Sequence, residues 1–170
     1  MFLHASCVAF RRRTEGGDEE KSDWSGVLIR GPSGGGKSAF ALRLIALGAT
    51  LVSDDQTVLR RAAGGWVEAS APDRLFGVVE ARGLGLLRLD ALRSSPVDWV
   101  VELRMGGAEG RLPPLRTTDL LGVETPVLAL PDDERAAAAL CCLVRGGALL
   151  DPEADLADLK VDRARGGGEA

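Results

Sequence analysis

Short apolar runs separated by polar or glycine-rich breaks dominate the pattern of the chain. Runs rich in valine, isoleucine and leucine that are bounded by turn residues are typical of β-strands. Such runs predict strands at residues 2–10, 26–31, 49–53, 97–104 and 124–130. Residues 56–61 and 66–70 flank the turn sequence AAGG and predict a hairpin, and residues 77–89 predict a short strand interrupted by glycines.

Two stretches follow the period of a helix instead. In the first, apolar residues recur between positions 40 and 47 among good helix formers, and Gly48 ends the pattern. This predicts a helix of about three turns. In the second, residues 131–147, acidic residues stand at the start and glycines at the end, as the helix dipole and a helix C-terminus favour. Strands alternating with helices favour an α/β fold.

The length of 170 residues suits one domain with a sizeable core. We expect a single domain over residues 1–160. Residues 10–24 are polar and carry blocks of both charges, which predicts an exposed loop, either a plain solvated loop or one that binds a partner. Residues 161–170 have no apolar pattern and predict a disordered tail.

The net charge of −4 leaves the surface without the basic footprint of a nucleic-acid-binding protein. No apolar stretch is long enough to span a membrane, and the N-terminus lacks the basic region of a secretory signal. We therefore expect a cytoplasmic protein with neither nucleic acid nor membrane as a partner. Cys7, Cys141 and Cys142 lack the spacing of a metal site or a disulfide framework, which predicts buried thiols in a reduced compartment.

The sequence GPSGGGKS, residues 31–38, matches the phosphate-binding pattern G-x-x-x-x-G-K-[ST] between a predicted strand and a predicted helix. Backbone N–H groups of such a loop surround phosphate oxygens, its lysine reaches the terminal phosphates, and its serine hydroxyl can ligate Mg²⁺. The predicted nucleotide-binding residues are Gly31, Ser33, Gly34, Gly35, Gly36, Lys37 and Ser38. The motif predicts nucleotide binding but does not choose among reactions.

Two aspartates, Asp54 and Asp55, directly follow the predicted strand 49–53. The carboxyl edge of an α/β sheet is where phosphate loops also lie, so we expect these carboxylates near the glycine loop. Phosphoryl transfer to a hydroxyl needs a carboxylate near the metal and a base for the proton, and the pair offers both. The alternative is that the two residues only form a turn or cap a helix.

With GPSGGGKS followed by GATLVSDD and then GVVEARGLG, the chain resembles the catalytic domain of bacterial HPr kinase/phosphorylase. The segment from Glu80 to Gly85 matches the family's Glu-x-Arg-Gly-Leu-Gly signature, and the resemblance extends from about His4 to about Leu143. It implies an α/β P-loop kinase domain of the HPr kinase/PEP carboxykinase-like type, in which helices flank a mixed sheet.

The resemblance also implies an activity. The family uses ATP and Mg²⁺ to phosphorylate a serine of the phosphocarrier protein HPr, and with inorganic phosphate it removes that phosphate and releases pyrophosphate. The expected partner is therefore HPr or an HPr-like phosphocarrier, and a homo-oligomer is a further expectation. By resemblance, Asp54 transfers the proton of the acceptor and Asp55 assists it.

The resemblance also implies functions for four further residues. Ser38 and Glu80 would hold Mg²⁺, and Arg82 would stabilise phosphate charge, for which its forked guanidinium is suited. An exposed Glu80–Arg82 ion pair on one strand face is the alternative. His4, the only histidine, aligns with a histidine beside the family's active site, whereas periodicity alone makes it an ordinary edge-strand residue.

The chain departs from the family pattern in two places. Only about thirty residues precede the glycine loop, which is typical of a short form without the family's additional N-terminal domain. The proline- and arginine-rich loop near the family's C-terminus is replaced by ALPDDERAAAA, which affects reversal, oligomer contacts and HPr docking. Two other functions stay open: a small-molecule kinase, with residues 106–116 as its candidate arginine lid, and a nucleotide-binding regulator without transfer activity.

Overall fold

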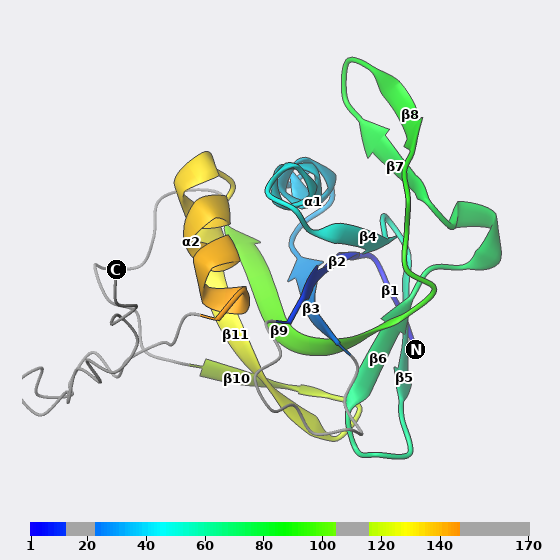
Figure 1. Ribbon diagram of the computed structural model, residues 1–170, viewed down its shortest axis with the longest axis vertical. Coiled ribbons are helices and arrows are strands. Elements are labelled where there is room, and N and C mark those ends of the chain that lie inside the picture. The colour runs from blue at the N-terminus through cyan, green and yellow to red at the C-terminus, as the bar shows by residue number, and fades with distance from the viewer. Residues whose placement is uncertain (13–22, 105–115, 147–170) are drawn as a thin grey trace, which may run out of the picture.

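A curled mixed sheet forms the centre of the molecule (Figure 1). The computed structural model describes residues 1–12, 23–104 and 116–146. The central strands lie in the order β4 (Thr50–Ser53), β2 (Ser6–Arg11), β3 (Trp24–Arg30), β9 (Ser95–Arg104) and β11 (Val123–Pro131). Strands β3, β9 and β11 are parallel to one another, and β2 is antiparallel to both β3 and β4. Strand β4 therefore runs in the same direction as β3.

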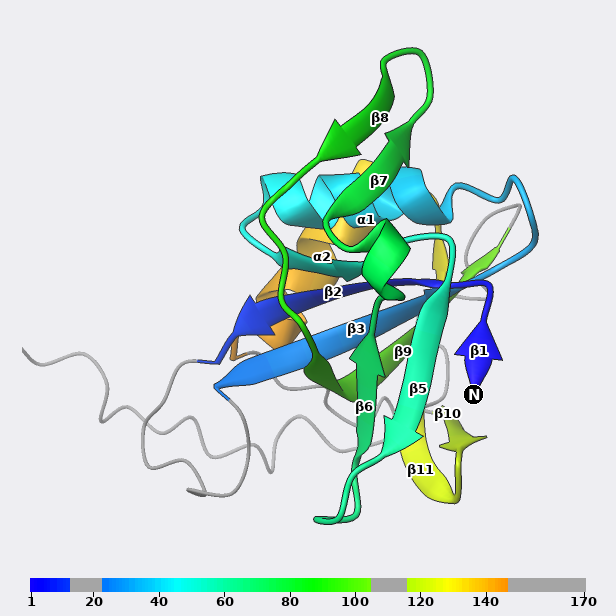
Figure 2. The same cartoon turned by 90° about the vertical axis from the view of Figure 1, so that its right-hand side faces the viewer.

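A second layer of strands lies at the start of β9 (Figure 2). Strands β5 (Thr57–Arg61) and β6 (Val67–Ser70) form the hairpin that the sequence predicts, and β6 pairs with the first two residues of β9. Strand β1 (Phe2–Leu3) pairs with β5. On the opposite side, β10 (Arg116–Leu120) pairs with β11. Strand β9 thus joins the two groups of strands, because it pairs with β6 at its start and with β3 and β11 further along.

Helices α1 (Lys37–Ala46) and α2 (Glu134–Val144) pack on one face of the central strands (Figure 1). Successive residues of β2 point alternately to the two faces of the sheet. Val8 and Phe10 lie in the core beneath the helices, whereas Cys7 and Ala9 lie in the core towards the β5–β6 layer. The central strands are thus buried on both faces, which explains why they read as continuous apolar runs.

A separate two-stranded sheet stands out from this body next to α1 (Figures 1 and 2). It consists of β7 (Val78–Ala81) and β8 (Gly85–Arg88). The turn between them needs Gly83 at a φ of +86° and Gly85 at +114°, in the left-handed region that glycine enters without steric cost. The glycines that interrupt the apolar pattern of residues 77–89 therefore mark a hairpin turn. The 3₁₀-helix Asp73–Leu75 precedes this hairpin.

The α/β fold class with a mixed sheet and flanking helices is confirmed. One strand, β10, was not predicted, because its residues are mostly exposed and polar and show no apolar alternation. Residues 13–22 of the predicted exposed loop and the predicted tail 161–170 lie outside the described residues. In the part of the chain that the structure describes, no helix is long and apolar enough to cross a membrane.

The prediction of buried thiols is correct for Cys7 and wrong for Cys142. Cys142 is exposed because it lies off the stripe of α2 that packs on the sheet, which includes Ala137, Leu140 and Val144. Cys141 is half-buried beside that stripe. Burial raises the pKa of the Cys7 thiol to about 12, so this thiol stays protonated at neutral pH.

Candidate active site

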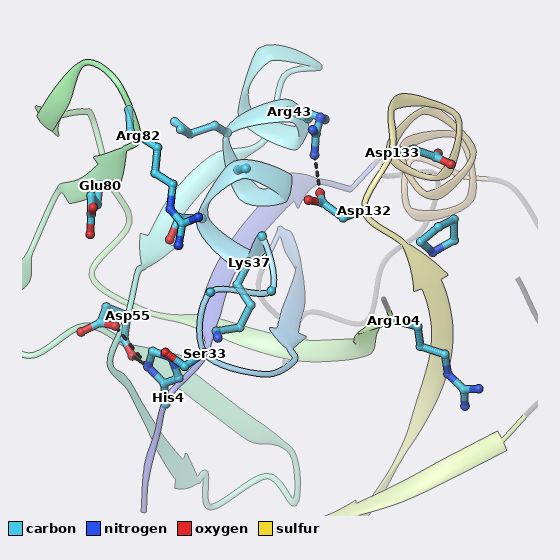
Figure 3. A pocket seen from close by; sticks show the side chains of 18 of the residues that line it. His4, Ser33, Lys37, Arg43, Asp55, Glu80, Arg82, Arg104, Asp132 and Asp133 are labelled. Carbon is cyan, nitrogen blue, oxygen red and sulfur yellow. Dashed lines mark hydrogen bonds and ion pairs between the residues drawn. The ribbon is translucent and has the colours of Figure 1, made fainter. Parts of the chain in front are cut away.

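The carboxyl ends of four strands meet at one edge of the sheet. Because β3, β4, β9 and β11 run in the same direction, the segments that follow them emerge together. A cavity of about 1070 Å³ lies at this edge. Its lining residues come from the glycine loop and α1, from the ends of β4, β9 and β11, from the β7–β8 hairpin, and from His4 between β1 and β2. Figure 3 shows these side chains around Lys37.

The glycine loop joins β3 to α1 and lines the cavity from Ser33 to Ser38. Gly34 and Gly36 have φ values of +74° and +87°, so the loop requires glycine at both positions. Gly36 is the N-cap of α1 and has no side chain to cap the first N–H groups. These N–H groups and the positive end of the helix dipole therefore offer an anion site. Of the predicted loop residues, Gly31 alone does not line the cavity.

Lys37, the first residue of α1, is only 6% exposed. Its Nζ donates hydrogen bonds to the carbonyl oxygens of Gly31 at 3.1 Å and Pro32 at 2.9 Å. Burial lowers the pKa of Lys37, and the negative charges of Asp55 and Asp54 oppose this shift. The ammonium thus lies within the electrostatic influence of both aspartates, as a phosphate-binding lysine beside a reaction centre would.

Asp54 and Asp55 follow β4 but face different surroundings. Asp54 is 3% exposed, and its Oδ1 accepts a hydrogen bond from the Ser6 hydroxyl at 2.5 Å, while its Oδ2 accepts one from the Glu80 backbone N–H at 3.3 Å. Asp55 has a left-handed φ of +62°, which aspartate tolerates better than most residues, and it lines the cavity. Asp54 is therefore fixed behind the cavity wall, and Asp55 is the member of the pair that faces the cavity.

His4 contacts the second aspartate (Figure 3). Its Nδ1 lies 3.1 Å from Asp55 Oδ1 and 3.0 Å from the Asp55 carbonyl oxygen. Both partners accept hydrogen bonds, so Nδ1 carries a proton and donates it. His4 is exposed in the cavity and is not an edge-strand residue, since it falls between β1 and β2.

The β7–β8 hairpin supplies Glu80 and Arg82 to the cavity, and both side chains are exposed there. One guanidinium nitrogen of Arg82, Nη2, lies 3.6 Å from the point that a Cβ atom on Gly34 would occupy. Arg82 therefore reaches the glycine loop. No ion pair joins Glu80 to Arg82 in the described residues, so the alternative of a surface ion pair finds no support. The hairpin turn also carries Leu84, which lines the cavity and is 82% exposed.

Four charged residues of the cavity are not among the predicted site residues, although two of them lie in the segment ALPDDERAAAA that departs from the family pattern. They are Arg43, Arg104, Asp132 and Asp133. Arg43 lies on α1 one helical turn beyond Ala39, so the helical period could have placed it on the face that begins at the loop. Arg104 and Asp132 stand at the ends of β9 and β11, and only the parallel pairing of these strands brings them to this edge. Asp133 caps α2 by accepting a hydrogen bond from the Ala136 N–H at 2.8 Å.

Comparisons with known proteins agree with the signature segments. Residues 24–94 match the family model described as the HPr Serine kinase C-terminal domain. The resemblance to the HPr kinase/phosphorylase family is confirmed. The match contains the glycine loop, the Asp54–Asp55 pair and the β7–β8 hairpin, whereas His4 and Asp132 lie outside it.

Two curated HPr kinase/phosphorylases illustrate the degree of similarity. The protein of Bordetella pertussis is 53% identical over 62 residues, which are 36% of this chain and 20% of that protein. The protein of Brevibacillus brevis is 33% identical over 116 residues, which are 64% of this chain and 35% of that protein. The chain thus matches only a fifth to about a third of the length of these HPr kinase/phosphorylases.

A solved structure shares the fold. The HPr(Ser) kinase/phosphatase structure from Coxiella burnetii superposes with a TM-score of 0.67 at 23% sequence identity. The alignment covers 85% of this chain and 93% of that one. At this identity the similarity establishes the architecture, so roles for individual residues must be argued from the cavity itself.

Proposed function

We propose that the protein is a Mg-ATP-dependent kinase that phosphorylates a serine of HPr or an HPr-like phosphocarrier. The observation that carries the proposal is a shared cavity: the glycine loop, Asp55, His4, Glu80 and Arg82 all line it. A phosphate-binding loop beside carboxylates, and open to solvent, suits transfer of a terminal phosphate to an incoming hydroxyl. In the reverse direction, inorganic phosphate would take the phosphoryl group from the serine and leave as pyrophosphate.

The glycine loop would hold the phosphates of ATP. Its N–H groups and the N-terminus of α1 would bind their oxygens, and Lys37 would turn from the loop carbonyls to the terminal phosphates. Arg82 would approach the same phosphates from the hairpin, since it already lies beside Gly34. Negative charge that develops on the phosphate oxygens during transfer would then be stabilised by two cations, Lys37 from α1 and Arg82 from the hairpin.

Ser38 and Glu80 fit a magnesium ion that is held mainly by substrate phosphates. Mg²⁺ keeps several waters and takes only one or two protein oxygens at such sites, and both residues present oxygens to the cavity. When bound, the ion would neutralise phosphate charge.

The proton-accepting role is proposed for the Asp54–Asp55 pair: the family resemblance assigns it to Asp54, whereas Asp55 is the member that lines the cavity. A carboxylate has about four lone-pair sites, and Ser6 and the Glu80 N–H occupy two of those on Asp54, so acceptor capacity remains. These two bonds also fix the orientation of the carboxylate. Asp55, with His4 beside it, would orient the acceptor hydroxyl at the cavity wall.

The hairpin supports a protein acceptor over a small molecule. Leu84 and Leu86 are 82% and 75% exposed, and Leu86 pairs across the hairpin with Glu80, so apolar surface lies directly beside the cavity. Exposed leucines near a reaction site suit contact with another protein. The candidate lid of a small-molecule kinase falls largely on residues 106–115, outside the described residues, and Arg116 begins β10.

The test is transfer of radiolabelled phosphate from Mg-ATP to the host's HPr-like carrier and to a carrier with its acceptor serine replaced by alanine. We expect label on the first carrier only. Inorganic phosphate is then added: release of the label as pyrophosphate would demonstrate the reverse reaction, and label without release would support the kinase and assign the lost reversal to the altered segment around Asp132 to Arg135. Rapid labelling of a small metabolite with no label on the carrier would favour the small-molecule kinase. Nucleotide binding with no transfer to any acceptor would favour the regulator.

A further inference from the structure

An ion pair at the rim of the cavity has no role in the proposed transfer. Arg43, from the second turn of α1, donates through Nη1 to Asp132 Oδ1, directly after the end of β11 (Figure 3). Both residues line the cavity, and their side chains are 34% and 32% exposed. The pair therefore links two elements at the place where the nucleotide's phosphates are proposed to bind.

The Asp132 carboxylate lies against the last glycine of the phosphate loop. A Cβ atom on Gly36 would come within 2.1 Å of Asp132 Oδ2 and 2.7 Å of its Cγ, so no side chain could separate them. Gly36 is also the N-cap of α1. A negative charge thus sits in the same positive potential that attracts phosphate, and it opposes phosphate binding.

Arg43 is suited to bind phosphate but is already engaged by Asp132. A guanidinium offers five donors in a fork that matches phosphate oxygens, and Arg43 opens onto the same cavity as Lys37 and Ser38. Apart from His4, the lining of the cavity contains equal numbers of basic and acidic side chains. Its basic residues are Lys37, Arg43, Arg82 and Arg104, and its acidic residues are Asp55, Glu80, Asp132 and Asp133.

We propose that Asp132 occupies the guanidinium of Arg43 beside the phosphate loop, so that Arg43 is not free to bind phosphate, and thereby sets a reduced affinity for the phosphate groups of a nucleotide. Arg43 is a reserve phosphate-binding residue, and Asp132 is the residue that restrains it. The inference rests on the proposed binding of nucleotide phosphates by the loop. It requires that the two residues act on affinity with opposite signs, which a purely structural ion pair would not do.

The experiment measures equilibrium binding of ADP and of inorganic pyrophosphate, each with Mg²⁺, to the full chain by calorimetry. Asp132→Asn keeps the size of the side chain against Gly36 and releases Arg43, so we expect roughly tenfold tighter binding, the size of one charge-assisted hydrogen bond. Arg43→Gln leaves Asp132 unpaired beside the loop, and we expect binding to weaken by about three- to tenfold. The double variant Arg43→Gln/Asp132→Asn should return close to wild type.

Arg60→Gln is the matched control, because it removes an arginine from an exposed ion pair with Glu68 on the β5–β6 hairpin, away from the cavity. Its affinity should equal that of wild type. If Asp132→Asn and Arg43→Gln both weaken binding, or both leave it unchanged, the proposed opposition is wrong. Lys37→Ala tests the proposed nucleotide site separately from the roles of Arg43 and Asp132. Unchanged ADP binding in this variant would overturn the proposed nucleotide site itself.

Discussion

The cavity has two walls that are built very differently. The glycine loop is anchored on β3, whose residues Val27, Leu28 and Ile29 are completely buried, and on α1, whose Phe40 and Leu44 are equally buried. The β7–β8 hairpin opposite forms its own two-stranded sheet, and its Glu80, Leu84 and Leu86 are exposed. A rigid core thus fixes the side that is proposed to bind phosphate, and a protruding element carries the side that an acceptor would meet. The difference indicates that substitutions in the two walls should separate chemistry from acceptor recognition.

The largest effect is expected on the rigid wall. Lys37→Ala should lower phosphoryl transfer by about 10³-fold or more and weaken ATP binding, because a cation at the terminal phosphates is lost. Folding should be retained, since among the described residues the Lys37 Nζ bonds only to the carbonyl oxygens of Gly31 and Pro32 in its own loop. Transfer assays and a thermal melt measure both quantities. Undiminished transfer would show that the loop is not the donor site.

The second-largest effect on transfer is expected at Asp54, which joins the two walls. Asp54 accepts a hydrogen bond from the Glu80 N–H on the hairpin, and its replacement by Asn should cost roughly 10²–10⁴ in transfer rate while Mg-ATP binding persists. Asp55→Asn is the matched comparison, because it removes an adjacent carboxylate that lines the cavity. A greater loss in Asp55→Asn would move the proton-accepting role to Asp55.

The protruding wall should affect recognition alone. Leu84→Ser and Leu86→Ser should raise KM for the protein acceptor by about three- to tenfold, because each removes apolar area from a contact. KM for ATP and the melting temperature should stay unchanged, since both side chains are mostly exposed. Leu47→Ser, at the far end of α1 and outside the lining of the cavity, is the control. An equal change in KM for ATP would contradict the separation of the two walls.

The last effect concerns the stability of the sheet beneath both walls at alkaline pH, and no change in activity at neutral pH is expected from it. The folded protein raises the pKa of Cys7 from 9.0 to about 12, so the unfolded chain loses this proton first. The stability that this confers is complete below pH 9 and is lost as the pH rises towards 12. In that range the free energy of unfolding should fall by up to about 1.4 kcal/mol per pH unit from this group. Chemical denaturation of wild type and Cys7→Ala at several pH values should show a shallower fall in the variant; parallel curves would contradict the assignment.

The sequence predicted the rigid wall better than the rest of the site for a physical reason. Continuous apolar runs and the fixed spacing of the glycine loop are local signals, and they located β3, α1 and the residues from Ser33 to Ser38. Strand β10 has no such signal, because it is exposed on an edge. The β7–β8 hairpin was recognised as a signature segment, but its apolar run read as an interrupted strand.

Two features of the cavity depend on geometry that no local pattern carries. Arg43 and Asp132 are 89 positions apart and meet only because β11 runs parallel to β9. Adjacent aspartates look equivalent in the sequence, and the left-handed φ of +62° at Asp55 is what turns one towards the cavity and leaves the other behind it. Pairing order and single backbone angles of this kind arise from tertiary packing.

The lining of the cavity extends along the chain from His4 to Asp133, almost the whole described length. A partly folded chain therefore has no complete cavity, and the proposed nucleotide would recognise only the finished fold. By mass action such a ligand stabilises that fold, by about 2.7 kcal/mol at a concentration one hundred times its Kd. The nucleotide supply of the cell would then govern how long each molecule survives unfolding and proteolysis, in addition to how fast it works.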